Sequence, residues 1–345
     1  MRKTALNYVY ELAKINPNVV FIGSDLGPGV LDKMKNEMPS RFYMEGVSEQ
    51  HIIGMSAGLA SEGFIPYVNT IATFLSRRCF EQIAMDLCLH NLPVKLIANG
   101  GGLVYAPLGP THLAIEDFAI LRSLPNMTIL APCDAIEMSA LMKCSISWDK
   151  PTYIRLGKGG DKIISSNETD FEIGKSVIMK KPDDCMFVTT GVMAQIALEA
   201  CDILEKQNIK CGLIHNHTVK PIDSKCLLNW IPKVKASISV EEHFRTGGMG
   251  SLILEILNDN LGAKLVNFSR VGIPDGFTKN YGSQNSLLDS MEAWLSMILI
   301  ASSRDDWSLW LNLSICVSTL QSIKRTLSII AFIPVSIISG TEIIR

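Results

Sequence analysis

The sequence has no excess of charge of either sign. Its 32 Lys and Arg residues face 34 Asp and Glu residues, which leaves a formal net charge of -2. A balance of this kind gives no basic field for the phosphate backbone of nucleic acid. We therefore expect no nucleic-acid partner.

Paired cysteines are also absent. The nine cysteines are scattered, without a CxxC pair or a zinc-type spacing, which fits free thiols in a reducing compartment and indicates no metal site. At the N-terminus, Glu11 and Lys14 interrupt any apolar core of the signal type, and the stretch reads as an amphipathic helix. No export signal is indicated, and we expect a cytoplasmic protein.

A dinucleotide fingerprint is missing as well. The glycine-rich stretch NGGGLVYAPLGPTH (99–112) follows a predicted strand but lacks the GxGxxG spacing. Its glycines permit close approach of the backbone, Pro107 and Pro110 stiffen it, and His112 stands at its far end. Since open α/β sheets bind ligands at the carboxyl ends of their strands, we interpret this stretch as an active-site loop. On the residues alone, a lone loop histidine is more often a structural hydrogen-bonding group.

Two sets of short apolar runs alternate with helical stretches along the chain. With 47% hydrophobic residues in 345, the chain can bury large cores in about two domains. The runs carry little polar alternation, as buried parallel strands do. They predict an α/β fold with two doubly wound, mostly parallel sheets. The predicted strands are 19–23, 66–72, 93–100, 127–132 and 151–157, then 185–191, 210–216, 236–242 and 264–272.

Changes in composition set the expected domain limits. The first domain covers 1–160, a Gly-, Ser- and Asp-rich linker 161–184, and the second domain 185–288. An atypical tail, 289–345, holds three of the five tryptophans and shows no clear helical or strand period. Its charge-free stretches, 307–323 and 326–341, are at or below the roughly 17 to 25 residues that span a bilayer. We expect a poorly ordered tail that catalysis does not need, with membrane attachment as the lesser option.

Two ionisable residues stand at the head of one predicted helix. In MEGVSEQHIIGMSAGLA (44–60), the run from residue 52 has an apolar face and a glycine face, which predicts a helix packed tightly on both sides. Glu49 and His51 would then lie where this helix enters the core. On the residues alone, Ser48 could cap the helix and Glu49 could simply complement its positive end.

An ordered series of motifs runs through the chain. The motifs are GVSEQHIIGMSAGLA (46–60), TIATFLSRRCFEQI (70–83), GPTHLAIEDFAILRSLPNMTILAPCD (109–134), PTYIRLGKG (151–159), HTVKPID (217–223) and SVEEHFRTGGMGS (239–251). The series resembles the C-terminal half of a transketolase and the matching part of 1-deoxyxylulose-5-phosphate synthase, over roughly residues 1–288. The resemblance implies the pyrimidine-binding domain of a thiamine diphosphate enzyme, followed by the family's C-terminal domain.

The resemblance implies roles for five residues. Glu49 would share a proton with the ring nitrogen of the cofactor's aminopyrimidine, so that the cofactor becomes a nucleophile toward the ketose carbonyl. Phe74 would stack on that ring, and His112 would hydrogen-bond the substrate near its reacting carbons. Lys158 would anchor a sugar phosphate, and His51 would line the substrate channel. Without the resemblance, Phe74 reads as core and Lys158 as a solvated loop lysine.

Two departures from the family pattern bear on function. Leu108 stands where transketolases carry an aspartate that contacts a sugar hydroxyl, which leaves the donor and acceptor sugars open. The Gly-Asp-Gly element that holds the diphosphate and Mg²⁺ in the family's N-terminal half has no match here, and GSD at 23–25 is the nearest triplet. We therefore expect a split enzyme whose N-terminal, diphosphate-binding subunit holds thiamine diphosphate and Mg²⁺, in an α2β2 arrangement with small sugar substrates.

Two alternatives stay open at this point. A beta subunit of a 2-oxo-acid dehydrogenase shares the implied fold and the half-enzyme arrangement. A non-catalytic α/β partner protein, or a truncated pseudoenzyme, would explain the unusual tail. The GPTH and SEQH elements favour a transketolase subunit over both.

Overall fold

A computed structural model describes residues 1–290 apart from 25–28, 30, 158, 168 and 263–265. The predicted tail, 289–345, thus lies almost wholly outside the described residues, as do Asp25 and Lys158. Within the described part, no helix has both the length and the apolar character needed to cross a bilayer.

The first sheet has seven strands in the order β10-β5-β6-β4-β3-β1-β2. Six of them pair in parallel, and β10 joins the edge antiparallel to β5. The central strands β1, β4, β5 and β6 are buried throughout. The strands are β1 Val19–Gly23, β2 Phe42–Met44, β3 Ile65–Ile71, β4 Lys95–Asn99, β5 Thr128–Leu130, β6 Thr152–Arg155 and β10 Thr218–Lys220.

The second sheet has five strands in the order β12-β11-β8-β9-β7. All pair in parallel except β7, which lies antiparallel at the edge beside β9. Apolar residues with few charges fill β8, β9 and most of β11, which explains their burial between helices. The strands are β7 Val177–Lys180, β8 Cys185–Thr189, β9 Cys211–His215, β11 Ala236–Phe244 and β12 Phe268–Ile273.

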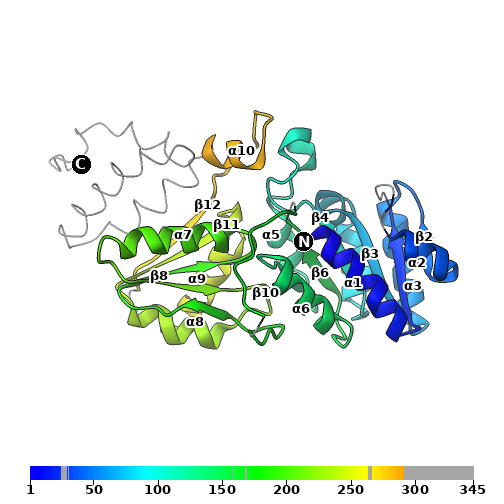
Figure 1. Cartoon of the computed structure of the whole chain (residues 1–345), viewed down its shortest axis with the longest axis horizontal. Coiled ribbons are helices and arrows are strands. Elements are labelled where there is room, and N and C mark those ends of the chain that lie inside the picture. Colours follow the sequence, from blue (N-terminus) through cyan, green and yellow to red (C-terminus); the bar gives the residue numbers. More distant parts are fainter. Residues whose placement is uncertain (25–28, 30, 158, 168, 263–265, 291–345) are drawn as a thin grey trace.

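Helices cover both faces of each sheet (Figure 1). The α-helices are α1 Arg2–Ile15, α2 Asp32–Glu37, α3 Glu49–Ser61, α4 Phe80–Gln82, α5 Asp117–Arg122, α6 Ala135–Ser145, α7 Met193–Glu205, α8 Ser224–Trp230, α9 Met249–Leu261 and α10 Gln284–Ser290. Two π-helices, η2 Phe74–Arg78 and η3 Ile83–Cys88, flank α4. Short 3₁₀ turns are η1 Pro39–Arg41, η4 Ala106–Leu108, η5 Pro110–His112 and η6 Ile231–Lys233.

One hydrophobic cluster spans both sheets. On one side of the first sheet, α1 and α6 pack together over β1. On the other side, α3, η3 and α5 form a cluster that continues without a break into α8 and α9 beneath the second sheet. Because β10 leaves the second set of elements to extend the first sheet, the domains are joined by backbone pairing as well as by packing.

These observations confirm the predicted fold class of two doubly wound, mostly parallel α/β sheets. One packing expectation was wrong. Gly54 and Gly58 in α3 are exposed, and a Cβ built on either would meet nothing within 4 Å, so α3 is packed on one side only. Ser48 does begin α3, but its hydroxyl donates to the Glu45 carbonyl instead of capping the helix.

Candidate active site

Glu49 opens α3 and points its carboxylate into the protein at the carboxyl end of β1. The residue is only 3% exposed. Ser24, directly after β1, donates its hydroxyl to Glu49 Oε1 at 3.3 Å. Arg78, at the end of η2, places Nη1 at 2.5 Å from Glu49 Oε2. The buried carboxylate therefore has one partner on each oxygen, and its main charge partner is Arg78.

Phe74 lies beside this ion pair. The Arg78 guanidinium carbon is 4.3 Å from the Phe74 ring centroid, so the planar cation lies over the aromatic face. The His112 ring meets the Phe74 ring edge-on, with the centroids 5.3 Å apart and an interplanar angle of 63°. Three of the predicted residues, Glu49, Phe74 and His112, are thus brought together, with Arg78 between the first two.

An open cavity of about 540 Å³ adjoins Phe74. Its wall is formed by η2 and by the turn that carries His112, and Phe277 from the second domain completes it. Two of its residues are arginines, which makes it the kind of site that suits an anionic substrate. The lining residues are Thr73, Phe74, Arg77, Arg78, Pro110, Thr111 and Phe277.

The π-helical geometry of η2 places both arginines at this cavity. Arg77 bonds the Thr111 carbonyl at 3.2 Å and pairs with Glu116 at 3.0 Å, so it ties η2 to the turn that holds His112. Thr111 Oγ1 lies 2.9 Å from His112 Nδ1. Single π-helical segments are frequent at functional sites, and here the segment positions an aromatic ring and two cations together.

The second domain holds the loop that leads to His112. Leu103 donates its backbone N–H to Glu242 Oε1 at 3.0 Å, and Gln284 of α10 donates to the same oxygen at 2.8 Å. Gly102 has a φ of +65°, and a Cβ there would lie 2.4 Å from the Glu242 carboxyl group. Burial raises the pKa of Glu242, with Arg155 acting in the opposite direction. The loop therefore depends on glycine for its conformation and on the second domain for its position.

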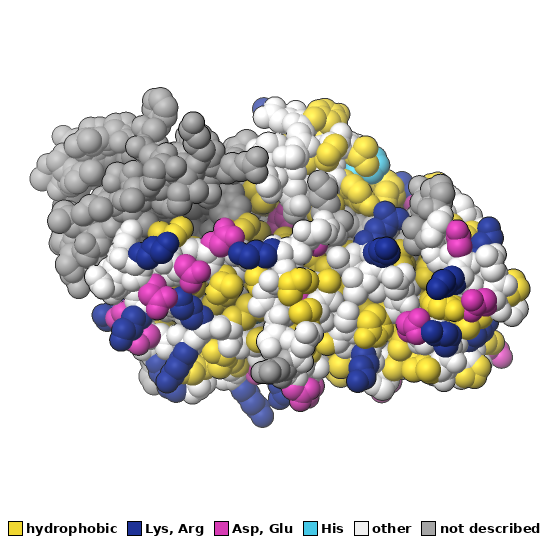
Figure 2. All heavy atoms as spheres, in the orientation of Figure 1, with side chains coloured by type: hydrophobic (Ala, Val, Ile, Leu, Met, Phe, Trp, Pro, Cys, Tyr) yellow, Lys and Arg dark blue, Asp and Glu magenta, His cyan; other side chains and the backbone are white. Residues whose placement is uncertain are grey.

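Exposed apolar residues lie beside the turn that carries His112. Leu108, Phe277 and Tyr281 are 50%, 72% and 69% exposed. The Tyr281 ring lies against Gly109, where a Cβ would come within 2.5 Å of it. Figure 2 shows hydrophobic side chains gathered with a histidine at the upper rim of the molecule. Such a concentration of apolar surface is typical of an interaction surface.

The remaining predicted residues are not part of this group. His51 is exposed, with its Nε2 3.7 Å from Glu45 Oε2, and it is not among the residues that line the cavity. Lys158 lies outside the described residues. The roles assigned to both remain predictions.

Sequence reasoning missed Arg78, Arg77 and Ser24. The signal for the arginines was present, since they follow Phe74 by one helical turn in TIATFLSRRCFEQI. Ser24 carried no such signal, because its contact with Glu49 joins residues 25 apart in the chain.

Comparison with protein families identifies both domains. Residues 1–160 match the family model "Transketolase, pyrimidine binding domain", and residues 174–291 match "Transketolase, C-terminal domain". The chain therefore consists of a pyrimidine-binding domain followed by a C-terminal domain. The chain belongs to the transketolase family, whose members require thiamine diphosphate.

Three known proteins illustrate the likeness. The chain is 36% identical over 272 residues to 1-deoxy-D-xylulose-5-phosphate synthase 1 of Geobacter sulfurreducens, covering 78% of this chain but only 42% of that enzyme. It is 32% identical to the 6-deoxy-6-sulfo-D-fructose transketolase subunit SqwH of a Clostridium species, covering 80% of this chain and 85% of the relative. A solved chain described as "Split gene transketolase, inactive beta4 tetramer" matches with a TM-score of 0.79 and 31% identity, over 88% of this chain and 97% of that one.

Proposed function

We propose that the chain is the C-terminal subunit of a split, thiamine diphosphate-dependent transketolase, which transfers a two-carbon ketol unit between sugar or sugar phosphate substrates. The observation that carries the proposal is the position of the Arg78 guanidinium. This flat group stacks on Phe74 and hydrogen-bonds a buried carboxylate, Glu49. An aminopyrimidine ring needs the same two partners, an aromatic face and a carboxyl group beside a ring nitrogen.

Phe74 and Glu49 supply these two partners, so the residues present fit the aminopyrimidine of thiamine diphosphate. Phe74 would hold the face of the aminopyrimidine, and Glu49 would meet its ring nitrogen once Arg78 has moved away. When bound, the cofactor supplies the nucleophilic carbon that attacks the ketose carbonyl. Glu49 holds the proton that it shares with the ring nitrogen, and Ser24 keeps the carboxyl group oriented through its 3.3 Å hydrogen bond.

The other side chains act on the substrate. His112, whose Nδ1 is held by Thr111, hydrogen-bonds the sugar near its reacting carbons. Arg78 is 44% exposed, so it can swing into the cavity when it leaves Glu49 and bind an anionic group there. Arg77 keeps its bond to the Thr111 carbonyl and so positions the histidine turn.

A partner subunit would complete the site. The chain spans about two fifths of the synthase that it matches, and the sequence contains no Gly-Asp-Gly element for the diphosphate and Mg²⁺. The exposed Leu108, Phe277 and Tyr281 offer that subunit an apolar surface beside the turn that carries His112. The relative named as a transketolase subunit and the solved chain described as an inactive beta4 tetramer support the split arrangement. We propose an α2β2 complex in which the partner holds the diphosphate and the metal.

Leu108 leaves the donor and acceptor sugars open in this proposal. Leu108 is half-exposed beside the His112 turn and offers no hydrogen bond to a sugar hydroxyl. The SqwH relative is named for a sulfonated deoxy sugar, which supports a donor of altered polarity without fixing its identity.

Reconstitution tests this function. The chain should be co-expressed with a diphosphate-binding half that is encoded beside it, and ketol transfer should be measured for each half and for the complex. We expect a stable complex that transfers a ketol unit, with neither half active alone. A complex that oxidatively decarboxylates 2-oxo acids would instead identify a dehydrogenase subunit, and failure to form any complex would remove the split-enzyme proposal.

A further inference from the structure

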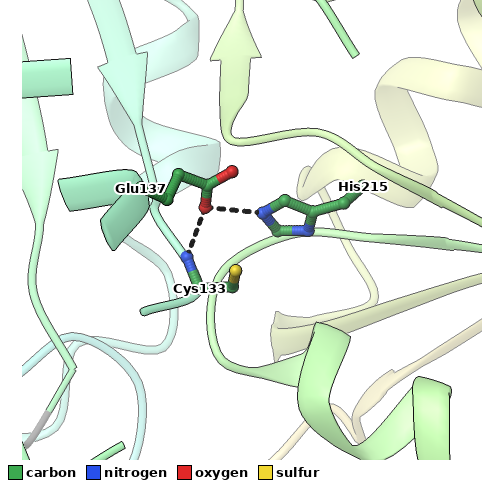
Figure 3. Close-up of side chains that lie close together, drawn as sticks. All are labelled: Cys133, Glu137 and His215. Carbon is green, nitrogen blue, oxygen red and sulfur yellow. Dashed lines mark hydrogen bonds and ion pairs between the residues drawn. The ribbon is translucent and has the colours of Figure 1, made fainter. Parts of the chain in front are cut away.

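Three side chains with different donor atoms meet where the two domains join, away from the candidate active site. Cys133 follows β5, Glu137 lies in the first turn of α6, and His215 ends β9 (Figure 3). All three are fully buried. Their thiol, carboxylate and imidazole donor atoms lie within 4.8 Å of one another.

The Glu137 carboxylate is only half satisfied. Its Oε2 accepts the Cys133 backbone N–H at 2.6 Å and contacts His215 Nε2 at 3.0 Å. Its Oε1 is buried and has no hydrogen-bond partner. A buried carboxylate oxygen without a partner is costly and requires an explanation such as a water molecule or an ion.

The other two donors are also available. The Cys133 thiol has one weak contact, with Ser165 Oγ at 3.5 Å. His215 Nδ1 lies 3.1 Å from Thr189 Oγ1. If the imidazole proton moves to Nδ1, Thr189 accepts it and Nε2 is left with a free lone pair, which is how a second contact usually orients a metal-bound histidine.

We propose that Cys133, Glu137 and His215 bind one transition-metal ion, with zinc as the favoured ion. The donor set of one sulfur, one nitrogen and one oxygen is typical of zinc. Glu137 binds through the carboxylate that already faces His215 Nε2. Binding releases the thiol proton to solvent, and the metal holds the thiolate.

The geometry requires a modest contraction. In a tetrahedral site with metal–ligand bonds of about 2.0 to 2.3 Å, the ligand atoms lie nearer to one another than the 4.8 Å within which these three donor atoms now lie. A buried donor for the fourth position lies close by, since the His217 ring centroid is 6.5 Å from that of His215 and His217 Nε2 has no partner.

Such an ion would cross-link the domains. Cys133 and Glu137 belong to the first sheet's β5–α6 connection, whereas His215 belongs to the second sheet. Gln195 of α7 adds a parallel link by donating to the Cys133 carbonyl at 2.9 Å. The role is therefore structural, and it is independent of the proposed ketol transfer and of the partner subunit.

Metal analysis of the full-length chain tests the inference directly. Protein purified without chelators should contain about one zinc per chain by elemental analysis, and cobalt loading should give a near-ultraviolet sulfur-to-cobalt band. Chelation should lower the Tm. Wild-type protein with no stoichiometric zinc and no cobalt band after loading would overturn the proposal, whatever the variants do.

Matched variants locate the ion. Cys133→Ser should abolish the cobalt–sulfur band, whereas Cys88→Ser, another buried cysteine, should keep it. His215→Gln should lose the zinc, whereas His90→Gln, at an exposed position, should retain it. Equal zinc content in His215→Gln and wild type would place the metal elsewhere and refute the assignment. A His217→Gln variant then identifies the fourth ligand as histidine or water.

Discussion

The guanidinium of Arg78 and the carboxylate of Glu49 form a close ion pair, 2.5 Å from Nη1 to Oε2, in which one partner is 44% exposed and the other 3%. The same guanidinium lies over Phe74. Arg78 thus neutralises a buried carboxylate in the free chain and occupies the surface that the proposed cofactor needs.

Removing Arg78 should cost more stability than removing the charge of Glu49. Arg78→Ala leaves a buried carboxylate without its counter-ion. We expect this to lower the free energy of unfolding by about 1–2 kcal/mol, less than for a fully buried pair because solvent screens the half-exposed Arg78. Glu49→Gln should cost less, and the double variant should resemble Glu49→Gln. Urea denaturation of the three variants checks this. Equal losses for Arg78→Ala and the double variant would show that the lost contact is packing, not charge.

Glu49 should be needed for turnover. In the reconstituted complex we expect Glu49→Gln to lower kcat by about 10² to 10⁴, as for loss of a general acid/base, with unchanged circular dichroism. Glu45→Gln is a matched control, since Glu45 is exposed and its side chain pairs with the exposed His51. Turnover near the wild-type value in Glu49→Gln would take this carboxylate out of the mechanism.

Acid should weaken the domain interface through His243. Its Nε2 accepts the Ala119 backbone N–H at 3.2 Å, and its Nδ1 donates to the Phe244 carbonyl at 2.7 Å, so the fold uses the neutral ring. Burial lowers its pKa from 6.5 to about 4, with Asp117 opposing and Arg155 reinforcing the shift. Because the folded pKa is depressed, this stabilisation is complete above pH 6.5 and falls as the pH drops toward 4. The loss amounts to about 3 kcal/mol.

Comparison of two variants isolates the His243 effect. The unfolding free energy of wild type and of His90→Gln should fall together between pH 6.5 and 4, and His243→Gln should show a shallower slope. Parallel slopes in all three proteins would mean that His243 is not the group that senses pH.

The tail should be dispensable, and α10 should not. Truncation after Asp289 should retain activity with the partner subunit, because it keeps Leu287 and Leu288, which pack in the cluster beneath the active-site loop. Truncation after Asn280 should lower activity at least tenfold, since it also removes the Gln284 hydrogen bond to Glu242. Loss of activity on truncation after Asp289 would show that the tail belongs to the working enzyme.

The sequence predicted the central strands well because burial leaves a strong local signal. The run at 19–23 matches β1, and the runs at 93–100 and 185–191 contain β4 and β8. Three short strands were missed. β2 and β7 are edge strands with partly exposed residues, so their apolar pattern is weak. β10 was missed because it pairs with β5 of the other domain, a tertiary contact that no local pattern encodes.

The same difference between local signals and long-range contacts separates the site residues that were predicted from those that were missed. Glu49, Phe74 and His112 were predicted as site residues because each stands in a compact motif that resembles the family's, and the structure brings the three together. The Arg78–Glu49 pair joins residues 29 apart, and Glu137 and His215 are 78 apart. Contacts at such separations depend on the assembled sheets and cannot be derived from spacing along the chain.

Calorimetric titration of thiamine diphosphate with Mg²⁺ tests the central claim, that this chain is one half of a split enzyme, most directly. The purified chain alone should bind the cofactor weakly or not measurably, because it holds the proposed pyrimidine contacts, Phe74 and Glu49, but its sequence has no Gly-Asp-Gly element for the diphosphate and metal. The same titration with the diphosphate-binding half present should show tight binding, near one cofactor per chain. Tight binding of the cofactor by the isolated chain would contradict the account.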